Sequence, residues 1–492
     1  MGMDHAPFDA FRASLGEGEA ALASLRAGLV GDGMMIDGPF GLKPLLYADY
    51  VASGRAVRPI ETFVMEHVLP YYANTHTEAS FCGRYMGRTR ETARRIIAGF
   101  CGAGDGYATI FAGSGATAGL NRLVDLFGVR AASDAARDGR GARPVVLIGP
   151  YEHHSNILPW RESGARMVEI PEAPQGGVDL AALEAALDAL PPDVPKIGAF
   201  SAVSNVSGII TDVDQVSALL RRFGARVVWD YAGGGPYVPI DMREGTPFQK
   251  DAVVLSPHKF IGGPGSSGIL IVRRDAVHRA SPVSPGGGTV RFVSPWAHDY
   301  SDDLVTREEG GTPNIVGDIR AALAFLVKDA IGQEVMDRRH DELRVMAWER
   351  WTANSNIVIL GSTPARKTLP IFSLRIRHPA DGGWLHQQLF TRMLSDAYGI
   401  QARGGCACAG PYAHRLLEIG QEDSETLRRA VLDGEELLKP GWVRLNLSVL
   451  FDDAKAAAII DAVDCLARDS ALLAEHYRVD EKTARWRVGD AP

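Results

Sequence analysis

Short runs of apolar, largely β-branched residues alternate with longer segments of helical periodicity between Tyr107 and Val272. The apolar runs are ATIF (108–111), VVLI (145–148), KIGAFSAV (196–203), RVVWD (226–230), AVVLS (252–256) and GILIV (268–272). Between the first two runs, segment 120–127 repeats leucine, valine and phenylalanine at the i, i+3, i+4, i+7 spacing of one helix face. This alternation predicts an α/β domain with a mostly parallel sheet, whose functional sites gather at the carboxyl ends of its strands.

The pattern changes after a Gly/Pro/Ser-rich stretch at 281–289. We expect helices over about 315–329, 384–398 and 453–470, and strands at 369–376, 399–403 and 443–450, which together predict a smaller α+β domain. The expected organisation is an N-terminal segment (1–60) that packs with the small domain, a large domain (61–325) and a small C-terminal domain (326–492). Segment 131–143 is expected to be a surface loop, and residues from 475 onward a polar tail.

Composition and charge are those of an ordinary globular protein. The chain has 492 residues, of which 46% are hydrophobic and 23% charged, with a net charge of −8. This balance offers no broad positive field for nucleic acid. Five scattered cysteines are too few for a disulfide framework. Residues 1–41 lack the pattern of a signal peptide, and no apolar run approaches the roughly 20 residues of a membrane helix, so we expect a soluble cytoplasmic protein with neither nucleic-acid nor membrane partners.

A lysine and a carboxylate follow two neighbouring predicted strands. Lys259 comes directly after the strand at 252–256, where an amine can be held for Schiff-base chemistry. Alone it is more often a solvated surface residue. Asp230 ends the preceding strand and can face a cationic ring nitrogen, as pyridoxal phosphate requires; a helix cap or loop hydrogen bond is the alternative.

A glycine-rich turn joins the first strand to the first helix. Gly113-Ser-Gly115-Ala116-Thr117 is typical of a phosphate cradle at a helix N-terminus. The same residues match the G-x-G-x-x-A fingerprint of dinucleotide-binding enzymes. However, the acidic residues Asp134 and Asp138 lie in the polar insertion and not at the end of the second strand, so the dinucleotide interpretation is the weaker one. A second G-x-G-x-x-G, at 263–268, precedes a strand and is interpreted as a turn beside Lys259.

Several motifs in a shared order identify a family. They are Glu152-His-His-Ser-Asn-Ile-Leu-Pro-Trp160, Val203-Ser-Asn205-Val-Ser-Gly208 and Glu309-Gly-Gly-Thr-Pro-Asn314, arranged around Ser256-Pro-His-Lys259. From about Leu46 to about Asp464 the chain resembles the pyridoxal-phosphate enzymes of the aminotransferase class V group, and within it the cysteine desulfurases and selenocysteine lyases. The resemblance implies pyridoxal-phosphate fold type I, the aspartate aminotransferase architecture with a mostly parallel seven-stranded sheet. It also implies a homodimer, with the 286–289 loop as a candidate crossing element.

The resemblance assigns roles to single positions. Lys259 would hold pyridoxal 5'-phosphate as a Schiff base and then move protons, Asp230 would pair with the ring nitrogen, and His153 would stack over the ring. Asn205 would lie near the ring hydroxyl and the substrate. The residues expected to hold the phosphate are Gly115, Ala116, Thr117, Ser256 and His258.

The C-terminal motif suggests the reaction. Arg403-Gly-Gly-Cys406-Ala-Cys408-Ala-Gly-Pro resembles the family's Arg-Thr-Gly-His-His-Cys-Ala-x-Pro, which implies Arg403 on the substrate carboxylate and Cys408 as sulfur acceptor. Lys259, His153 and Cys408 are therefore the expected catalytic residues. Cys408 as a small packing residue, or Cys406 and Cys408 with His414 as half of a metal site, are the alternatives; a lone C-x-C is weak support, and we predict no metal.

Two positions depart from the family pattern. Gly233 replaces the glutamine of Asp-x-Ala-Gln, and Cys406-Ala407 replaces the usual His-His. The predicted function is carbon–sulfur or carbon–selenium cleavage of a cysteine-like amino acid, giving alanine and a Cys408 persulfide, with a sulfur-acceptor protein as a further candidate partner. The nearest alternative is a class V aminotransferase, epimerase or other β-eliminating enzyme that does not use Cys408. A nicotinamide-dependent oxidoreductase and a catalytically silent binding protein are the rivals from other classes.

Overall fold

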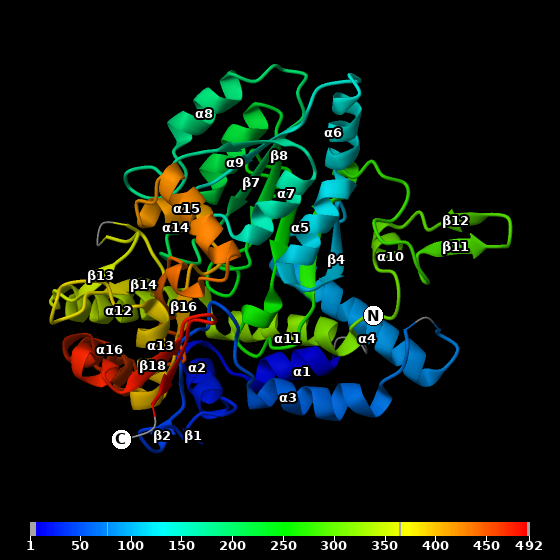
Figure 1. Cartoon of the computed structure of the whole chain (residues 1–492). Coiled ribbons are helices and arrows are strands. Elements are labelled where there is room, and N and C mark those ends of the chain that lie inside the picture. Colours follow the sequence, from blue (N-terminus) through cyan, green and yellow to red (C-terminus); the bar gives the residue numbers. More distant parts are fainter. Residues whose placement is uncertain (1–5, 76, 364–365, 490–492) are drawn as a thin grey trace. The chain divides into compact units, whose positions relative to one another are not determined.

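The computed structural model describes residues 6–75, 77–363 and 366–489 (Figure 1). The chain forms two compact units. Unit 1 comprises Met1–Gly28, Ser53–Val203 and Thr211–Gln333, and unit 2 comprises Leu29–Ala52, Ser204–Ile210 and Glu334–Pro492. The predicted placement of the whole segment 1–60 with the small domain differs from this division, which puts only 29–52 there. Helices α1 (Ala6–Ser14) and α2 (Gly18–Ala27) instead pack their buried faces against α11 (Ile315–Ile331) of unit 1.

A seven-stranded sheet forms the centre of unit 1. Its order is β4 (Tyr107–Gly113), β10 (Gly268–Arg273), β9 (Ala252–Leu255), β8 (Arg226–Asp230), β7 (Lys196–Ser201), β5 (Val145–Ile148) and β6 (Arg166–Glu169). Strand β10 is antiparallel to both neighbours and the remaining pairs are parallel. The mostly parallel sheet is confirmed, and each predicted apolar run contains a strand. Strand β6 was missed because Arg166 and Glu169 leave this edge strand without an apolar run.

Helices surround this sheet. The α-helices of unit 1 after α2 are α3 (Arg58–Phe63), α4 (Phe81–Phe100), α5 (Gly115–Leu126), α6 (Val129–Arg137), α7 (Leu158–Glu162), α8 (Leu180–Asp188), α9 (Val213–Arg222), α10 (Leu304–Glu308) and α11. The expected loop at 131–143 is wrong for its first half, because Val129 and Ser133 are buried one helical turn apart on α6. Helix α5 packs closely on β9, since a Cβ at Gly119 would lie only 2.9 Å from Val254 Cγ1.

Shorter helical turns link these elements. They are a π-helix at η1 (Val64–Val68) and 3₁₀ turns at η2 (Leu69–Tyr71), η3 (His154–Asn156), η4 (Pro257–Lys259), η5 (Arg274–Ala276) and η6 (Glu436–Leu438). Two of them, η3 and η4, carry motif residues. The turn at 263–268 packs against η4, because a Cβ at Gly263 would lie 1.9 Å from the Pro257 carbonyl oxygen.

Glu309, from the Glu-Gly-Gly-Thr-Pro-Asn motif, is a structural residue of unit 1. Its buried carboxylate accepts hydrogen bonds from Arg90 and Arg94 of α4, each at 2.5 Å, and from the backbone N–H of Phe111 at 2.7 Å. The two arginines hold the pKa of Glu309 below its usual range despite burial. This cluster fixes α4 to β4, the strand that leads into the glycine-rich turn.

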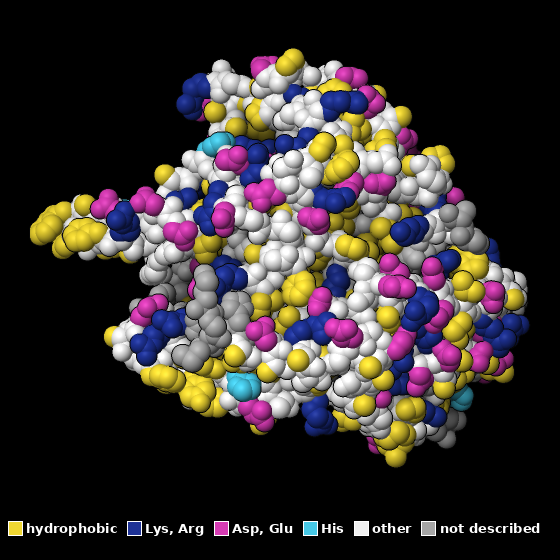
Figure 2. All heavy atoms as spheres, turned by 180° about the vertical axis from the view of Figure 1, so that it is seen from behind, with side chains coloured by type: hydrophobic (Ala, Val, Ile, Leu, Met, Phe, Trp, Pro, Cys, Tyr) yellow, Lys and Arg dark blue, Asp and Glu magenta, His cyan; other side chains and the backbone are white. Residues whose placement is uncertain are grey.

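A two-stranded hairpin follows the 286–289 loop. Strands β11 (Val290–Val293) and β12 (His298–Tyr300) pair antiparallel and project from the rest of unit 1 (Figure 1). At its tip, Phe292 is 56% and Trp296 90% exposed, and Figure 2 shows this end as a projecting group of hydrophobic side chains. The hairpin therefore exposes an apolar tip.

Unit 2 is built on a four-stranded antiparallel sheet. Its order is β13 (Ile357–Ile359), β14 (Ile371–Ile376), β17 (Trp442–Asn446) and β16 (Arg403–Gly405), and a separate parallel pair joins β15 (Ile400–Gln401) to β3 (Leu46–Tyr47). Strands β1 (Met35–Ile36) and β2 (Lys43–Pro44) form a further short pair. The expected strand at 399–403 is therefore divided between β15 and β16, and the one at 443–450 ends at Asn446.

The helices of unit 2 are α12 (Gln333–Thr352), α13 (Gln387–Tyr398), α14 (Gly410–Leu416), α15 (Gln421–Leu432) and α16 (Asp453–Ala474). The C-terminal region is not the expected polar tail, because β18 (Tyr477–Asp480) and β19 (Arg485–Val488) form an antiparallel hairpin. Tyr477 is buried and its hydroxyl donates to Asp396 of α13 at 3.1 Å, which fixes the hairpin to that helix.

Across the residues that the structure describes, no helix combines the length and the apolar character needed to cross a bilayer.

Candidate active site

Eight of the predicted site residues lie at or after the carboxyl ends of strands in unit 1. They are Gly115, Ala116 and Thr117 after β4, His153 after β5, Asp230 at the end of β8, and Ser256, His258 and Lys259 after β9. These ends lie at one edge of the sheet, because β4, β5, β8 and β9 run in the same direction.

The glycine-rich turn and the segment before Lys259 are in direct contact. The backbone N–H of Ala116 donates to Ser256 Oγ at 2.9 Å. Gly115 has a φ of 60°, and a Cβ there would lie 3.0 Å from Ser256 Oγ and 3.3 Å from the His258 ring. Position 115, the first of α5, is thus kept free of a side chain beside a hydroxyl and an imidazole, which lets an anion approach the helix N-terminus closely.

Ser155 was missed by the sequence analysis. Its hydroxyl lies 2.7 Å from Thr117 Oγ1 and 3.0 Å from His153 Nδ1, and its backbone N–H donates to the same Nδ1 at 3.1 Å. Because Nδ1 accepts, a neutral His153 carries its proton on Nε2. Ser155 therefore joins a predicted phosphate-binding residue to the predicted ring-stacking histidine.

Asp230 is a buried carboxylate beside the Lys259 charge. Its Oδ1 accepts the backbone N–H of Ala232 at 2.7 Å. Burial raises the pKa of Asp230, and the Ala232 hydrogen bond and the Lys259 ammonium oppose that rise. Burial and the same ammonium lower the pKa of His258. A buried carboxylate that meets a nearby cation is suited to pair with a protonated ring nitrogen.

Glu152, next to His153, belongs to a buried hydrogen-bond network that was not expected. It accepts from Asn156 Nδ2 and Ser201 Oγ, both at 2.6 Å, from the Ser201 N–H at 2.9 Å and from the Gly149 N–H at 3.2 Å. Burial raises the pKa of Glu152 to about 7, against the effect of these hydrogen bonds. The network fixes the backbone that presents His153.

The other predicted site residues, Asn205, Arg403 and Cys408, lie together in unit 2. Arg403 is the first residue of β16, and the chain then turns through Ala407 and Cys408, whose φ angles are 54° and 57°. This turn brings Arg403 Nη2 to 3.7 Å from Cys408 Sγ. A left-handed conformation at two consecutive non-glycine residues is strained and is typical of functional sites.

Asn205 holds this turn. Its Nδ2 donates to the Ala407 carbonyl oxygen at 2.9 Å, whereas its buried Oδ1 has no hydrogen-bond partner in the described part of the chain. Arg444 fixes the backbone of Asn205, because it donates to the Asn205 backbone carbonyl oxygen at 3.3 Å and also to the Asp49 carboxylate at 2.6 Å. An acceptor that is buried but unpartnered favours a ligand hydroxyl as its missing donor.

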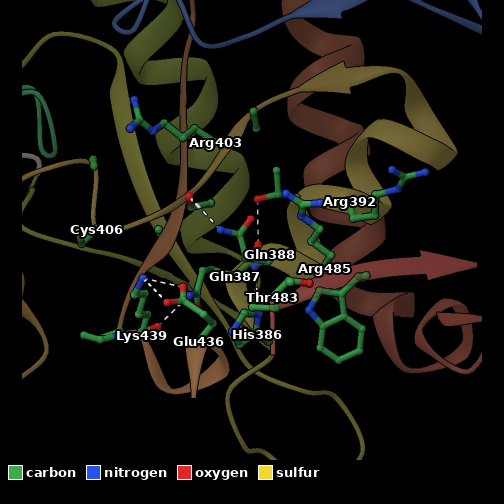
Figure 3. Close-up of a pocket in the computed structure, with 18 of the residues that line it drawn as sticks. His386, Gln387, Gln388, Arg392, Arg403, Cys406, Glu436, Lys439, Thr483 and Arg485 are labelled. Carbon is green, nitrogen blue, oxygen red and sulfur yellow. Dashed lines mark hydrogen bonds and ion pairs between the residues drawn. The ribbon is translucent and has the colours of Figure 1, made fainter. Parts of the chain in front are cut away.

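A pocket of about 890 Å³ opens beside this turn, and Cys406, Cys408 and Arg403 line part of it (Figure 3).

His414 uses both ring nitrogens for hydrogen bonds, to the Gly410 carbonyl oxygen and to Ser424. Within the described ranges no three His, Cys, Asp or Glu side chains gather as metal ligands. Asp134 and Asp138, the residues that a dinucleotide site would need, lie on α6 and at its end, paired with Arg137 and Arg140.

Comparisons with known proteins identify the family. The sequence profile described as "Aminotransferase class-V" matches residues 46–430, and the chain belongs to this family of pyridoxal-phosphate-dependent enzymes. A probable cysteine desulfurase of Halalkalibacterium halodurans is 28% identical over 372 residues, 75% of this chain and 85% of the relative. One from Staphylococcus aureus is 26% identical over 388 residues, 78% of this chain and 87% of the relative.

Solved structures show the same fold. A cysteine desulfurase from Thermococcus onnurineus has a TM-score of 0.69 at 23% identity, covering 86% of this chain and 95% of its own. One from Escherichia coli has a TM-score of 0.68 at 21% identity, covering 90% and 98%. The predicted architecture, fold type I with a seven-stranded sheet, is therefore confirmed.

Proposed function

We propose that the chain cleaves the carbon–sulfur or carbon–selenium bond of a cysteine-like amino acid with pyridoxal 5'-phosphate, giving alanine and a persulfide on Cys408. The observation that carries this proposal is the 3.7 Å contact between the Arg403 guanidinium and the Cys408 thiol on one strained turn. A guanidinium that can bind a carboxylate lies close to a thiol that can attack sulfur. This separation suits a small substrate that bears both a carboxylate and a sulfur atom. The names of the relatives point to the same chemistry.

The residues of unit 1 fit the cofactor. Gly115, Ala116 and Thr117 at the start of α5, together with Ser256 and His258, would hold its phosphate, and Asp230 would hold its ring nitrogen in the protonated form. When bound, pyridoxal phosphate draws electrons from the substrate Cα and so weakens the bonds to that atom. His153, oriented through Nδ1 by Ser155, would cover the ring.

Each protein group then has a defined role. Lys259 supplies the amine that carries the cofactor and moves a proton at the substrate Cα. Arg403 binds the substrate carboxylate and sets the orientation of the amino acid. The Cys408 thiolate attacks the substrate sulfur and retains it as a persulfide, while the Cβ–S bond breaks and its electron pair stays with the carbon skeleton that leaves as alanine. Asn205 offers its unpartnered Oδ1 to the ring hydroxyl or the substrate.

We also propose a homodimer that uses the β11–β12 hairpin. Its exposed tip, with Phe292 and Trp296, and its origin in the glycine-rich loop at 286–289 support a crossing element between two subunits. The cysteines of the chain are free thiols, which supports a reducing compartment and hence the cytoplasm.

The decisive experiment replaces one sulfur atom. Cys408→Ser holoenzyme, supplied with L-cysteine, is expected to keep its cofactor absorbance and to lose alanine and sulfane-sulfur production, whereas Cys465→Ser, on the exposed face of α16, keeps both. If Cys408→Ser still forms alanine and persulfide, the proposal is wrong. Release of a keto acid or of a racemised amino acid would identify the alternative, an aminotransferase or epimerase that does not use Cys408.

A further inference from the structure

The pocket beside Cys408 is cationic. Arg392, Arg403, Lys439, Arg485 and Arg487 line it, against the single carboxylate Glu436. Arg392 is neutralised by Asp396 at 2.6 Å and Lys439 by Glu436 at 2.5 Å. Arg485 has neither an ion pair nor a side-chain hydrogen bond among the residues that the structure describes. A carboxylate in the pocket would therefore meet unneutralised positive charge.

The C-terminal hairpin holds Arg485 in place. Tyr477 fixes β18 to Asp396 of α13, and the Trp486 ring lies 5.9 Å from the His386 ring at the start of that helix. In Figure 3, Arg485 and Arg392 lie on one side of the pocket, and Arg403 and Cys406 lie on the other. The hairpin thus faces the Cys406–Cys408 turn with a fixed guanidinium.

Two half-buried thiols, Cys406 and Cys408, line the same pocket. Its volume of about 890 Å³ is that of a small-molecule site. We propose that this pocket binds a small thiol that bears carboxylates, and that this thiol accepts the sulfur from Cys408. This inference rests on the proposed function and names the acceptor that the reaction requires.

The transfer needs no further reactant. The thiolate of the bound acceptor attacks the outer sulfur of the Cys408 persulfide and forms a new S–S bond. The old S–S bond breaks, and its electron pair stays on Cys408 Sγ as a thiolate. The outer sulfur keeps its proton, so the products are the acceptor persulfide and free Cys408, with no net oxidation. Arg485 would hold a carboxylate of the acceptor during this step.

The test compares an anionic with a neutral acceptor. Holoenzyme is loaded with sulfur by L-cysteine or, independently of turnover, by inorganic polysulfide, and the second-order rate of persulfide loss is measured with mercaptosuccinate and with mercaptoethanol. Taking the ratio of the two rates within each variant removes the intrinsic reactivity of the thiols. The ratio is expected to fall about 10-fold in Arg485→Ala and to recover in part in Arg485→Lys. Arg478→Ala, on the same hairpin outside the pocket, is expected to leave it unchanged.

Alkylation of the two thiols tests the pocket without any sulfur chemistry. The ratio of iodoacetate to iodoacetamide labelling at Cys406 and Cys408, measured by peptide mass spectrometry, is expected to fall in Arg485→Ala and not in Arg478→Ala. If the ratio of the mercaptosuccinate rate to the mercaptoethanol rate is unchanged in Arg485→Ala, the inference is overturned, whatever the alkylation result. Efficient transfer only to a protein acceptor also overturns it. Failure of L-cysteine alone to load Cys408, with polysulfide loading intact, counts against the proposed function instead.

Discussion

Arg403 Nη2 donates a hydrogen bond to Cys408 Sγ across 3.7 Å, five residues along the chain. The contact depends on two consecutive left-handed residues, Ala407 and Cys408, each of which costs roughly 1–2 kcal/mol in backbone strain. Asn205 compensates by binding the Ala407 carbonyl oxygen. Backbone strain that is maintained by a contact from a distant segment, here Asn205, is typical of catalytic and ligand-binding sites.

Replacing Arg403 is expected to weaken recognition of the substrate carboxylate. Arg403→Ala should lower kcat/KM for cysteine about 100-fold, since charge-assisted hydrogen bonds contribute about 1.5–3 kcal/mol each. Cysteamine, which lacks the carboxylate, should react equally with both enzymes. Steady-state kinetics with the two amines measure this difference, and Arg428→Ala on the exposed α15 is the matched control. Equal losses for cysteine and cysteamine would show that Arg403 does not bind the carboxylate.

Asp230→Asn preserves the size of the side chain and removes its charge. Asn can still accept the Ala232 N–H, but it cannot keep a ring nitrogen protonated, so kcat is expected to fall by about 100-fold or more, as for the loss of one partner of a buried charge pair. The absorbance of the bound cofactor reports occupancy separately from turnover. Asp275→Asn, at an exposed position, serves as the control. An Asp230→Asn enzyme with at least half of the original kcat would contradict the assigned role.

The Glu309 cluster is expected to stabilise the fold and not the reaction itself. Glu309→Gln leaves Arg90 and Arg94 without their shared buried carboxylate and should lower the free energy of unfolding by about 3 kcal/mol. Glu91, which also pairs with Arg94 but is half exposed, should cost only about 0.5 kcal/mol as Glu91→Gln. Urea denaturation measures the free energy of unfolding of both variants. Similar decreases for Glu309→Gln and Glu91→Gln would show that the buried Glu309 cluster is no more stabilising than the exposed pair.

Glu152 should give unit 1 a measurable pH dependence. Its pKa is about 7 in the folded protein, against 4.5 for an ordinary glutamate, so the folded state holds the proton more tightly. Stability from this group is therefore present at low pH and is lost as pH rises from about 4.5 to about 7. In the apoprotein, the stability of Glu152→Gln relative to the original chain should rise by about 2.5 kcal/mol between about pH 5 and about pH 8.

Glu162→Gln, at an exposed position ten residues away, provides the control for this pH series. Thermal denaturation at matched ionic strength gives the difference at each pH. A constant difference between Glu152→Gln and the original chain would mean that Glu152 stays ionised in the folded protein throughout this range.

Local sequence was enough to predict most strands of the seven-stranded sheet and to recognise the family motifs. Runs such as VVLI (145–148) are buried on both faces, so their composition alone identifies them. The glycine-rich turn and Lys259 were predicted because each directly follows such a run. The contact between Ala116 and Ser256 joins residues 140 positions apart and is the result of strand order, which the motifs only implied.

The features that were missed depend on contacts between distant segments. Nothing near Ser155 indicates that Thr117, 38 residues earlier, lies within a hydrogen bond of it. The C-terminal hairpin consists of two short strands with few apolar residues, and it is fixed by distant contacts such as that of Tyr477 with Asp396, 81 positions earlier. The polar sequence of 131–143 predicts a loop, and the first half is helical instead with only two buried side chains on α6.

The most direct measurement is a single turnover of holoenzyme with L-cysteine, followed by peptide mapping. We expect one alanine per active site and a mass increase of one sulfur atom on the peptide that contains Cys408, with borohydride fixing the cofactor to Lys259 in a parallel sample. Alanine without added sulfur on Cys408, or cofactor attached to any residue other than Lys259, would contradict the proposed function.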